Sequence, residues 1–349
     1  MGVYWYTRMT LALPKIDLSG AITTIDSHTG GNPTRVVVSG VDPIAGTTVL
    51  AKRETLRLQN DSLRRVLVHE PRGGGLMCAV LVLEPCDPLA DASIIFLEQD
   101  EYPPMSGHST IGVAMTLVET GMVARTEGRT RVVLDTPAGL VTAWVDTHGE
   151  TTGPVTLEMP PSFVAAEHVP IDGHEGVTVD IAYGGDYYAC VDAASLGLKL
   201  RRDNTDAIKL AAAGIRQSLA TRRFPHPTRP YINRVYYVLF WENVTGETRH
   251  TRNVVICPPS VVDRSPCGTG TASLLALMHH RGSISVGEHL INEGILGTAF
   301  DGCIDRLDTI EGIPTVIPRV TGTAYITGFH QFLVDRRDSL PTGFVLDNQ

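Results

Sequence analysis

Two short segments of this chain resemble each other, and each places a hydroxyl or thiol side chain beside glycine. The first is PMSGHST at residues 104–110, and the second is PCGTGT at residues 266–271. An apolar run follows each segment and predicts a helix, so Ser106 and Cys267 would each stand at a helix N-terminus. In a duplicated fold, the two segments would face each other across one pocket. One proton-handling group on each side of a substrate suits chemistry at a stereocentre.

Cys267 has the surroundings of a reactive thiol. Pro266 cannot lie inside a helix but suits its start, which places Cys267 at the N-terminus. Free N–H groups and the positive end of the helix dipole lower the pKa of a thiol there, and a thiolate is a competent base. The same N–H groups, with Gly268 and Gly270 allowing close approach, form an anion site suited to a carboxylate. The alternative is a buried structural thiol in a glycine-rich turn.

Ser106 by itself would be interpreted as the N-cap of its helix, the usual role of serine at that position. Its correspondence with Cys267 favours a place in the site instead. His108 would supply a hydrogen bond or a proton, although a lone histidine in a polar loop is more often structural. Asp263, shortly before Cys267, adds an acid to the same constellation.

The elements that must position these residues are mostly strands. Runs rich in β-branched or apolar residues predict strands at 34–39, 78–83, 93–97, 131–135, 176–180, 235–240, 251–256 and 321–326. Helices are fewer, and we expect them at 51–67, 111–118, 204–221 and 272–278. Asn204 is a suitable cap for the third of these helices. A polar stretch with three prolines, residues 147–161, places a domain boundary near 150–165.

Composition narrows the class of protein. The 349 residues suffice for two domains, and 43% hydrophobic with 19% charged residues is typical of a globular chain. The net charge of -9 argues against nucleic-acid binding, which needs a basic excess. We expect no membrane span and no signal peptide, because no apolar run is long enough and the N-terminus lacks the signal pattern. The six cysteines form no C-x-x-C pair, which disfavours a zinc site and suits reduced thiols in the cytoplasm.

Six motifs together carry a resemblance to a known family. They are DSHTGGNPTR at 26–35, EPRG at 70–73, MSGH at 105–108, DTPAG at 135–139, YGG at 183–185 and DRSPCGTG at 263–270. The chain resembles the proline racemase family, which includes hydroxyproline 2-epimerases and trans-3-hydroxy-L-proline dehydratases. The resemblance implies an α/β (α+β) fold like that of diaminopimelate epimerase, with two pseudo-symmetric halves, each a β-barrel-like sheet around a central helix. The first half would comprise residues 20–155 plus 321–349, and the second residues 156–320.

The resemblance also implies a site without metal or organic cofactor, a small-molecule substrate (hydroxyproline or proline) and, often, a homodimer. In the racemases two cysteines flank the substrate α-carbon, one taking the α-proton as thiolate and the other protonating the opposite face. The second of these cysteines maps to Cys267, and the first maps to Ser106. The substrate-binding positions map to Gly107, His108, Asp263, Gly268 and Thr269. The backbone N–H groups of Gly107, His108, Gly268 and Thr269 would bind the carboxylate. Asp263 with His108 would hold the ring nitrogen.

The serine at position 106 decides which reaction we expect. A hydroxyl is a poor base unless strongly activated, so symmetric racemisation by two thiols is disfavoured. Dehydration of trans-3-hydroxy-L-proline to pyrroline-2-carboxylate requires one base and is our first expectation. The alternatives are 2-epimerisation of 4-hydroxyproline, alone or as a second activity, racemisation of proline or another amino acid, and a binding protein without activity. Gly74, where many relatives carry histidine, is a second departure that bears on the substrate.

Overall fold

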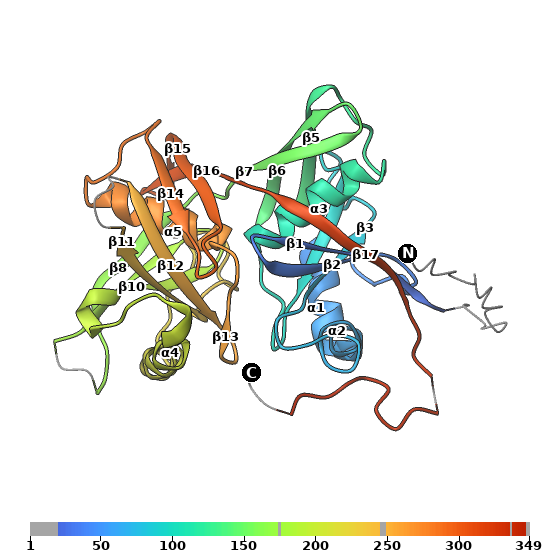
Figure 1. The fold of residues 1–349 in the computed structure, drawn as a ribbon, viewed down its shortest axis with the longest axis horizontal. Coiled ribbons are helices and arrows are strands. Elements are labelled where there is room, and N and C mark those ends of the chain that lie inside the picture. The colour runs from blue at the N-terminus through green and yellow to red at the C-terminus, as the bar shows by residue number, and fades with distance from the viewer. Residues whose placement is uncertain (1–19, 174–175, 245–248, 336, 347–349) are drawn as a thin grey trace, which may run out of the picture.

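The computed structural model describes residues 20–173, 176–244, 249–335 and 337–346. Figure 1 shows two lobes side by side, each with strands curved around one helix. Helix α3 (Gly107–Glu119) lies in one lobe and helix α5 (Gly268–His280) in the other. Both helices are buried along almost their whole length, which explains why their sequences are apolar on every face instead of amphipathic.

The first lobe holds the strands of the N-terminal part of the chain. They are β1 (Ile22–Thr29), β2 (Asn32–Ser39), β3 (Cys78–Leu83), β4 (Ala92–Leu97), β5 (Gly128–Thr136), β6 (Gly139–His148) and β7 (Thr151–Glu158). Their inward side chains and those of α3 form one apolar core, which includes Val36, Phe96, Ile111, Leu134 and Leu157. Helices α1 (Val49–Gln59) and α2 (Asp61–Val68) lie outside the sheet (Figure 1).

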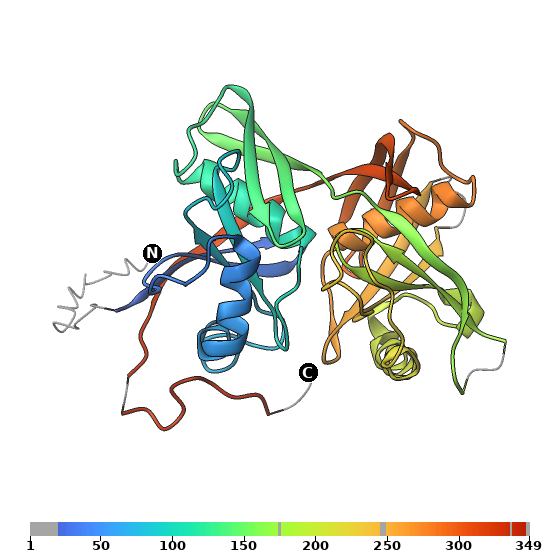
Figure 2. The same ribbon diagram turned by 180° about the vertical axis from the view of Figure 1, so that it is seen from behind.

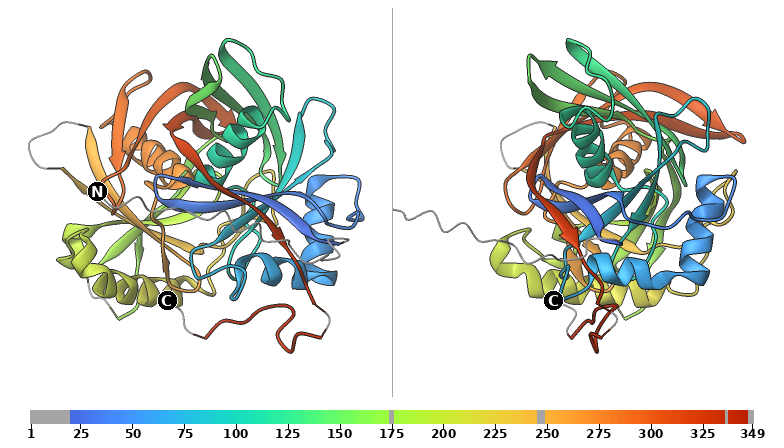
Figure 3. Two further views of the ribbon diagram at one scale, coloured as in Figure 1. Left: turned by 45° about the vertical axis from the view of Figure 1, so that its right-hand side comes forward. Right: turned by 90° about the vertical axis from the view of Figure 1, so that its right-hand side faces the viewer.

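The second lobe repeats this plan. Its strands are β8 (Phe163–Pro170), β9 (Thr178–Tyr183), β10 (Tyr187–Asp192), β11 (Tyr237–Asn243), β12 (His250–Cys257), β13 (Val261–Val262), β14 (His289–Glu293), β15 (Ala299–Ile310) and β16 (Ile313–Gly322). Its helices are α4 (Thr205–Leu219) and α5, with short 3-10 turns at Ala193–Leu196 and Arg202–Asn204. Helix α4 lies outside its sheet on the same side of the molecule as α2 (Figures 1 and 3).

The order of strand pairings is the same in the two lobes. In the first, β2 pairs with β3 in parallel, β3 with β4 antiparallel and β4 with β5 in parallel. In the second, β10 pairs with β11 in parallel, β11 with β12 antiparallel and β12 with β14 in parallel. The central helix of each lobe precedes the last strand of its series. This correspondence explains why Ser106 and Cys267 hold equivalent places.

Two connections join the lobes. Strand β7 pairs with both β6 and β16, and the chain then passes into β8 (Figure 2). In the other direction β16 continues into β17 (Ala324–Phe332), which pairs antiparallel with β1 along its length. The residue limits given above for the two halves stay a prediction, and residues 336 and 347–349 of the first half, like residues 1–19, lie outside the described part of the chain.

The sheet-dominated α/β class is confirmed, but several element boundaries differ from the prediction. The helix expected at 51–67 is two helices, because the backbone of Asn60 leaves the helical region between α1 and α2. The strand expected at 321–326 is divided between β16 and β17, and the strands expected at 176–180 and 235–240 begin two residues later, as β9 and β11. Asn204 precedes α4, but its side chain donates to the Lys199 carbonyl instead of capping the helix. In the described residues, no helix is both long and apolar enough to cross a bilayer.

Candidate active site

The two buried helices meet with their N-termini together. A Cβ atom added to Gly107 would lie 2.6 Å from the Cα of Gly268, so the first residues of α3 and α5 are in direct backbone contact. Such an approach is possible only because neither residue has a side chain. The free N–H groups and positive dipole ends of both helices therefore point at one place, which suits an anion such as a carboxylate.

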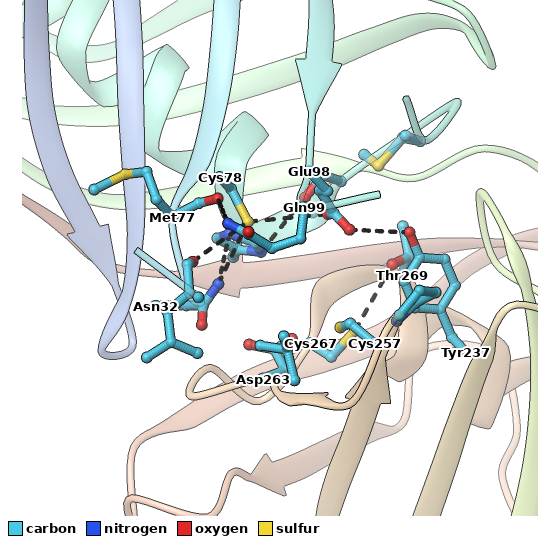
Figure 4. Close-up of a pocket in the computed structure, with 18 of the residues that line it drawn as sticks. Asn32, Met77, Cys78, Glu98, Gln99, Tyr237, Cys257, Asp263, Cys267 and Thr269 are labelled. Atoms are coloured by element: carbon cyan, nitrogen blue, oxygen red, sulfur yellow. Dashed lines mark hydrogen bonds between the residues drawn. The ribbon is translucent and has the colours of Figure 1, made fainter. Parts of the chain in front are cut away.

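One pocket at this junction brings together residues from both lobes. It is lined by Ser106, Gly107, His108, Asp263, Cys267 and Thr269, with Asn32, Glu98, Tyr188 and Tyr237 among the others. Gly268, the remaining predicted site residue, does not line this pocket but packs behind it against Gly107. Figure 4 shows the labelled side chains of the two lobes around the pocket.

The hydroxyl of Ser106 belongs to a small hydrogen-bonded ring. Ser106 precedes α3 in extended conformation and makes no capping hydrogen bond with its side chain. Its Oγ donates to Oγ of Ser109 at 3.2 Å and lies 3.4 Å from Nδ1 of His108. Oγ of Ser109 in turn lies 3.1 Å from Nε2 of the same histidine. Ser106 is therefore connected to both ring nitrogens of His108, directly and through Ser109.

Asn32 determines the tautomer of His108. The Oδ1 atom of Asn32 accepts the backbone N–H of Arg264 at 3.1 Å, so its amide nitrogen must face Nε2 of His108, 3.0 Å away. Nε2 is then an acceptor, and the ring proton is on Nδ1. Burial lowers the pKa of His108, with the charge of Asp263 opposing this, so the imidazole is neutral. A neutral His108 donates through Nδ1 toward Ser106 and accepts at Nε2.

Cys267 sits directly before α5, with a backbone φ of 62° that is uncommon for a residue other than glycine. Its sulfur accepts the N–H of Gly270 at 3.3 Å and lies 3.3 Å from the hydroxyl of Tyr188. That hydroxyl is also 2.6 Å from Oγ1 of Thr269, which fixes its position. The sulfur thus has hydrogen-bond donors placed to stabilise a thiolate.

The pKa of Cys267 differs from the sequence-based expectation. Burial raises the pKa of the thiol above its ordinary value, and the negative charge of Asp263 acts in the same direction. The hydrogen bonds from Tyr188, Gly270 and Thr269 oppose this rise without cancelling it. The expectation of a low pKa at the helix end is therefore wrong for this pocket, because it took account of the helix and not of the desolvation. In the pocket as it stands, the group is a thiol at neutral pH.

Asp263 is buried, with 5% of its surface exposed. Its Oδ1 accepts the N–H of Ser265 at 2.8 Å, and Oγ of Ser265 accepts the N–H of Cys267 at 3.1 Å. This chain of contacts orders the turn before α5 and holds the carboxylate beside the thiol. No arginine or lysine of the described residues forms an ion pair with it, and a buried carboxylate of this kind is suited to a cationic ligand.

Glu98 and Tyr188 are among the polar pocket residues that the sequence did not predict. Glu98 follows β4, and its Oε2 accepts the hydroxyl of Tyr237 at 3.1 Å across the two lobes (Figure 4). Tyr188 comes from β10 and reaches the sulfur of Cys267. Neither residue stands in a motif, because what brings each to the pocket is the path of its strand and not its sequence neighbours.

Gly74, the other departure noted above, lies outside the pocket lining, and its carbonyl accepts from the Gln99 side chain.

Known proteins resemble this chain over most of its length. The family model described as proline racemase matches residues 24–345. This chain belongs to the proline racemase family. A 4-hydroxyproline 2-epimerase of Streptosporangium roseum is 39% identical over 92% of this chain and 97% of its own length. A trans-3-hydroxy-L-proline dehydratase of Bacillus thuringiensis subsp. konkukian is 37% identical (94% and 99%), and a proline racemase of Clostridioides difficile is 38% identical (94% and 99%).

A solved structure extends the comparison to the fold. A hydroxyproline epimerase of Agrobacterium vitis, with bound trans-4-hydroxy-L-proline, superposes with a TM-score of 0.88 at 35% identity, covering 93% of this chain and 95% of that one. Members of the family thus carry the names of a dehydratase, epimerases and a racemase at nearly equal identity to this chain. The protein is an enzyme of this lyase and isomerase group.

Proposed function

We propose that this enzyme dehydrates trans-3-hydroxy-L-proline to pyrroline-2-carboxylate, with Cys267 as the base. The proposal rests on one observation: the two groups that line the pocket at the helix ends differ chemically, with a thiol at position 267 and a hydroxyl at position 106. Dehydration requires removal of one proton from the α-carbon, followed by loss of the hydroxyl, so one competent base suffices. Racemisation would require both groups to exchange protons.

The substrate itself would lower the raised pKa of Cys267 by offsetting the contribution of Asp263. In this proposal its carboxylate binds at the N-termini of α3 and α5, and its cationic ring nitrogen pairs with Asp263. A positive charge beside Asp263 removes the negative field that opposes ionisation of the thiol. The thiolate would then form when substrate is bound, with Tyr188 and the Gly270 N–H stabilising it.

The experiment is incubation of the purified protein with trans-3-hydroxy-L-proline and, separately, trans-4-hydroxy-L-proline. Ketimine formation, detected with o-aminobenzaldehyde, is expected from the first compound. Cys267→Ser should abolish it, and full activity of that variant would exclude Cys267 as the base. A change in optical rotation with the second compound, and no ketimine from the first, would contradict the proposal and identify an epimerase.

A specific observation favours 2-epimerisation of 4-hydroxyproline as the second candidate. The hydroxyl of Ser106 donates to Ser109, whose hydroxyl lies within hydrogen-bond distance of the acceptor nitrogen of His108. This arrangement gives the Ser106 proton a route to a neutral imidazole, so the serine would act as a proton carrier with histidine as the base behind it. Under this alternative, Ser109→Ala lowers epimerisation strongly while leaving exchange of the proton at Cys267 intact.

A further inference from the structure

Glu98 is a pocket residue that the removal of the α-proton does not use. It follows β4 directly and lines the same pocket as Ser106 and Cys267. Removal of the α-proton requires a base, a carboxylate site and a partner for the ring nitrogen, which Cys267, the two helix ends and Asp263 supply. Glu98 is a second carboxyl group in the pocket, and its chemistry has to be explained separately.

The position of Glu98 is fixed by its backbone and by its side chain. Its N–H donates to the carbonyl of Glu101 at 2.9 Å, and its own carbonyl accepts from the guanidinium of Arg64 at 3.0 Å. The next residue, Gln99, is 8% exposed and donates to the carbonyls of Val68 and Gly74. One carboxyl oxygen of Glu98 accepts from Tyr237 of the other lobe. The other oxygen, Oε1, lies 4.0 Å from Sγ of Cys78, and a side chain held in this way can present it to a ligand at a small ordering cost.

The charges around Glu98 favour its protonated form. Of the described residues that line the pocket, none is Arg or Lys, and the other titratable ones are Asp263, His108, Tyr188, Tyr237, Cys78, Cys257 and Cys267. His108 is neutral, so no cation there compensates a second negative charge. Burial, with the charge of nearby Glu101, raises the pKa of Glu98 to about 8. A carboxylic acid that keeps its proton at neutral pH is a hydrogen-bond donor and a general acid.

We propose that Glu98 is the catalytic acid that protonates the departing ring hydroxyl. The inference rests on the dehydration proposed above. Cys267 takes the α-proton, the electron pair of that C–H bond forms the double bond between C2 and C3, and the C3–O bond breaks. The oxygen leaves as water with the proton of Glu98. The enamine so formed tautomerises to pyrroline-2-carboxylate, and Glu98 regains a proton from solvent as Cys267 loses one.

The chemistry of the leaving group explains why such an acid is needed. Hydroxide is a poor leaving group, and protonation by a positioned acid typically accelerates a step by about 10²–10⁴-fold. Tyr237 donates to Oε2 of Glu98, which leaves the acidic proton on Oε1, where the contact with Sγ of Cys78 is long at 4.0 Å. A proline without a ring hydroxyl has no leaving group for this acid to protonate, so exchange of its α-proton should not depend on Glu98.

Glu98→Gln tests this role. Glutamine has nearly the same size and can still accept from Tyr237, but it has no acidic proton. Ketimine formation from trans-3-hydroxy-L-proline is expected to fall about 10²–10⁴-fold. Exchange of the α-proton of L-proline in D₂O, which has no leaving group, and the affinity for pyrrole-2-carboxylate are expected to stay within a few-fold. Glu98→Asp, which keeps the acid, is the matched control and should recover part of the ketimine rate.

Each other result would overturn a definite part of the argument. An unchanged ketimine rate in Glu98→Gln overturns the acid role alone. An equal loss of α-proton exchange and of pyrrole-2-carboxylate binding would show that Glu98 holds the ring nitrogen or supports Cys267, and that the acid role is wrong. Absence of ketimine with the wild-type enzyme overturns the proposed dehydration and this role with it.

Discussion

At the scale of single residues, the site holds titratable groups whose protonation must change during the proposed reaction. Cys267 is a thiol held beside the carboxylate of Asp263, and His108 is neutral in a buried place. Each has hydrogen-bond donors or acceptors placed for the proton it must gain or lose. The charge of the ligand is then the event that changes ionisation, because burial makes each unpaired charge costly.

The reactivity of Cys267 gives a direct prediction. Because burial and Asp263 raise its pKa above the ordinary thiol value of 9.0, iodoacetamide should alkylate it slowly near neutral pH, and the rate should still be rising at about pH 9. Peptide mass spectrometry would follow this residue separately from Cys78 and Cys257, which line the same pocket. Asp263→Asn should shift the rate profile to lower pH. A rate that is already maximal near neutral pH would contradict the raised pKa.

The serine at position 106 gives a second prediction. Ser106→Cys restores a thiol on the second side of the pocket, so racemisation of proline should rise by about tenfold or more, because a thiol exchanges its proton far more readily than a hydroxyl. Polarimetry with L-proline measures the gain against the wild-type enzyme. Ser195→Cys, at an exposed 3-10 turn, is a control for the added thiol. If Ser106→Cys gives no gain, pocket shape and not the missing thiol limits racemisation.

At the scale of elements, the site depends on the contact between the ends of α3 and α5. Gly107→Ala would place a methyl group 2.6 Å from the Cα of Gly268, where neither backbone can yield without moving a helix. We expect a loss of about 1–3 kcal/mol in the free energy of unfolding and a larger proportional loss of activity. Gly74→Ala, with open space around the added atom, is the matched control. Equal urea unfolding curves for the two variants would contradict the close contact.

The same elements show what sequence can and cannot predict here. The repeat of small residues before two apolar runs was enough to place Ser106 and Cys267 at corresponding helix ends. It did not reveal Glu98 or Tyr188, because strands β4 and β10 bring them to the pocket and nothing local marks them. It also gave the wrong direction for the pKa of Cys267, since a helix end is visible in a sequence and the degree of burial is not.

At the scale of the whole molecule, a buried carboxyl group lies where the two lobes meet. Asp186, in the turn after β9, is 3% exposed, and burial raises its pKa from 3.8 to about 7. It borders a large cleft together with Arg53 and Glu101 of the first lobe. The interface between the lobes is therefore sensitive to pH near neutrality.

A fourth prediction follows from the sign of this shift. Because the pKa of Asp186 is raised in the folded state, its contribution to the free energy of unfolding is fully present below about pH 4. This contribution is lost as pH rises to about 7. Asp186→Asn removes the ionisation, so its melting temperature relative to wild type should increase between about pH 5 and about pH 8. Thermal unfolding by circular dichroism checks this, with exposed Asp203→Asn as control. A difference independent of pH would refute the buried, protonated Asp186.

The pairing of β17 with β1 has a consequence for biosynthesis. The N-terminal strand of the first lobe finds this partner at the far end of the chain, where Ile22 faces Phe332. A ribosome delivers the N-terminal part first, so the first lobe emerges with one edge of its sheet unpaired while the second lobe is still being made. An exposed sheet edge invites pairing with other chains. We therefore expect the nascent enzyme to be most open to aggregation until translation has passed β17.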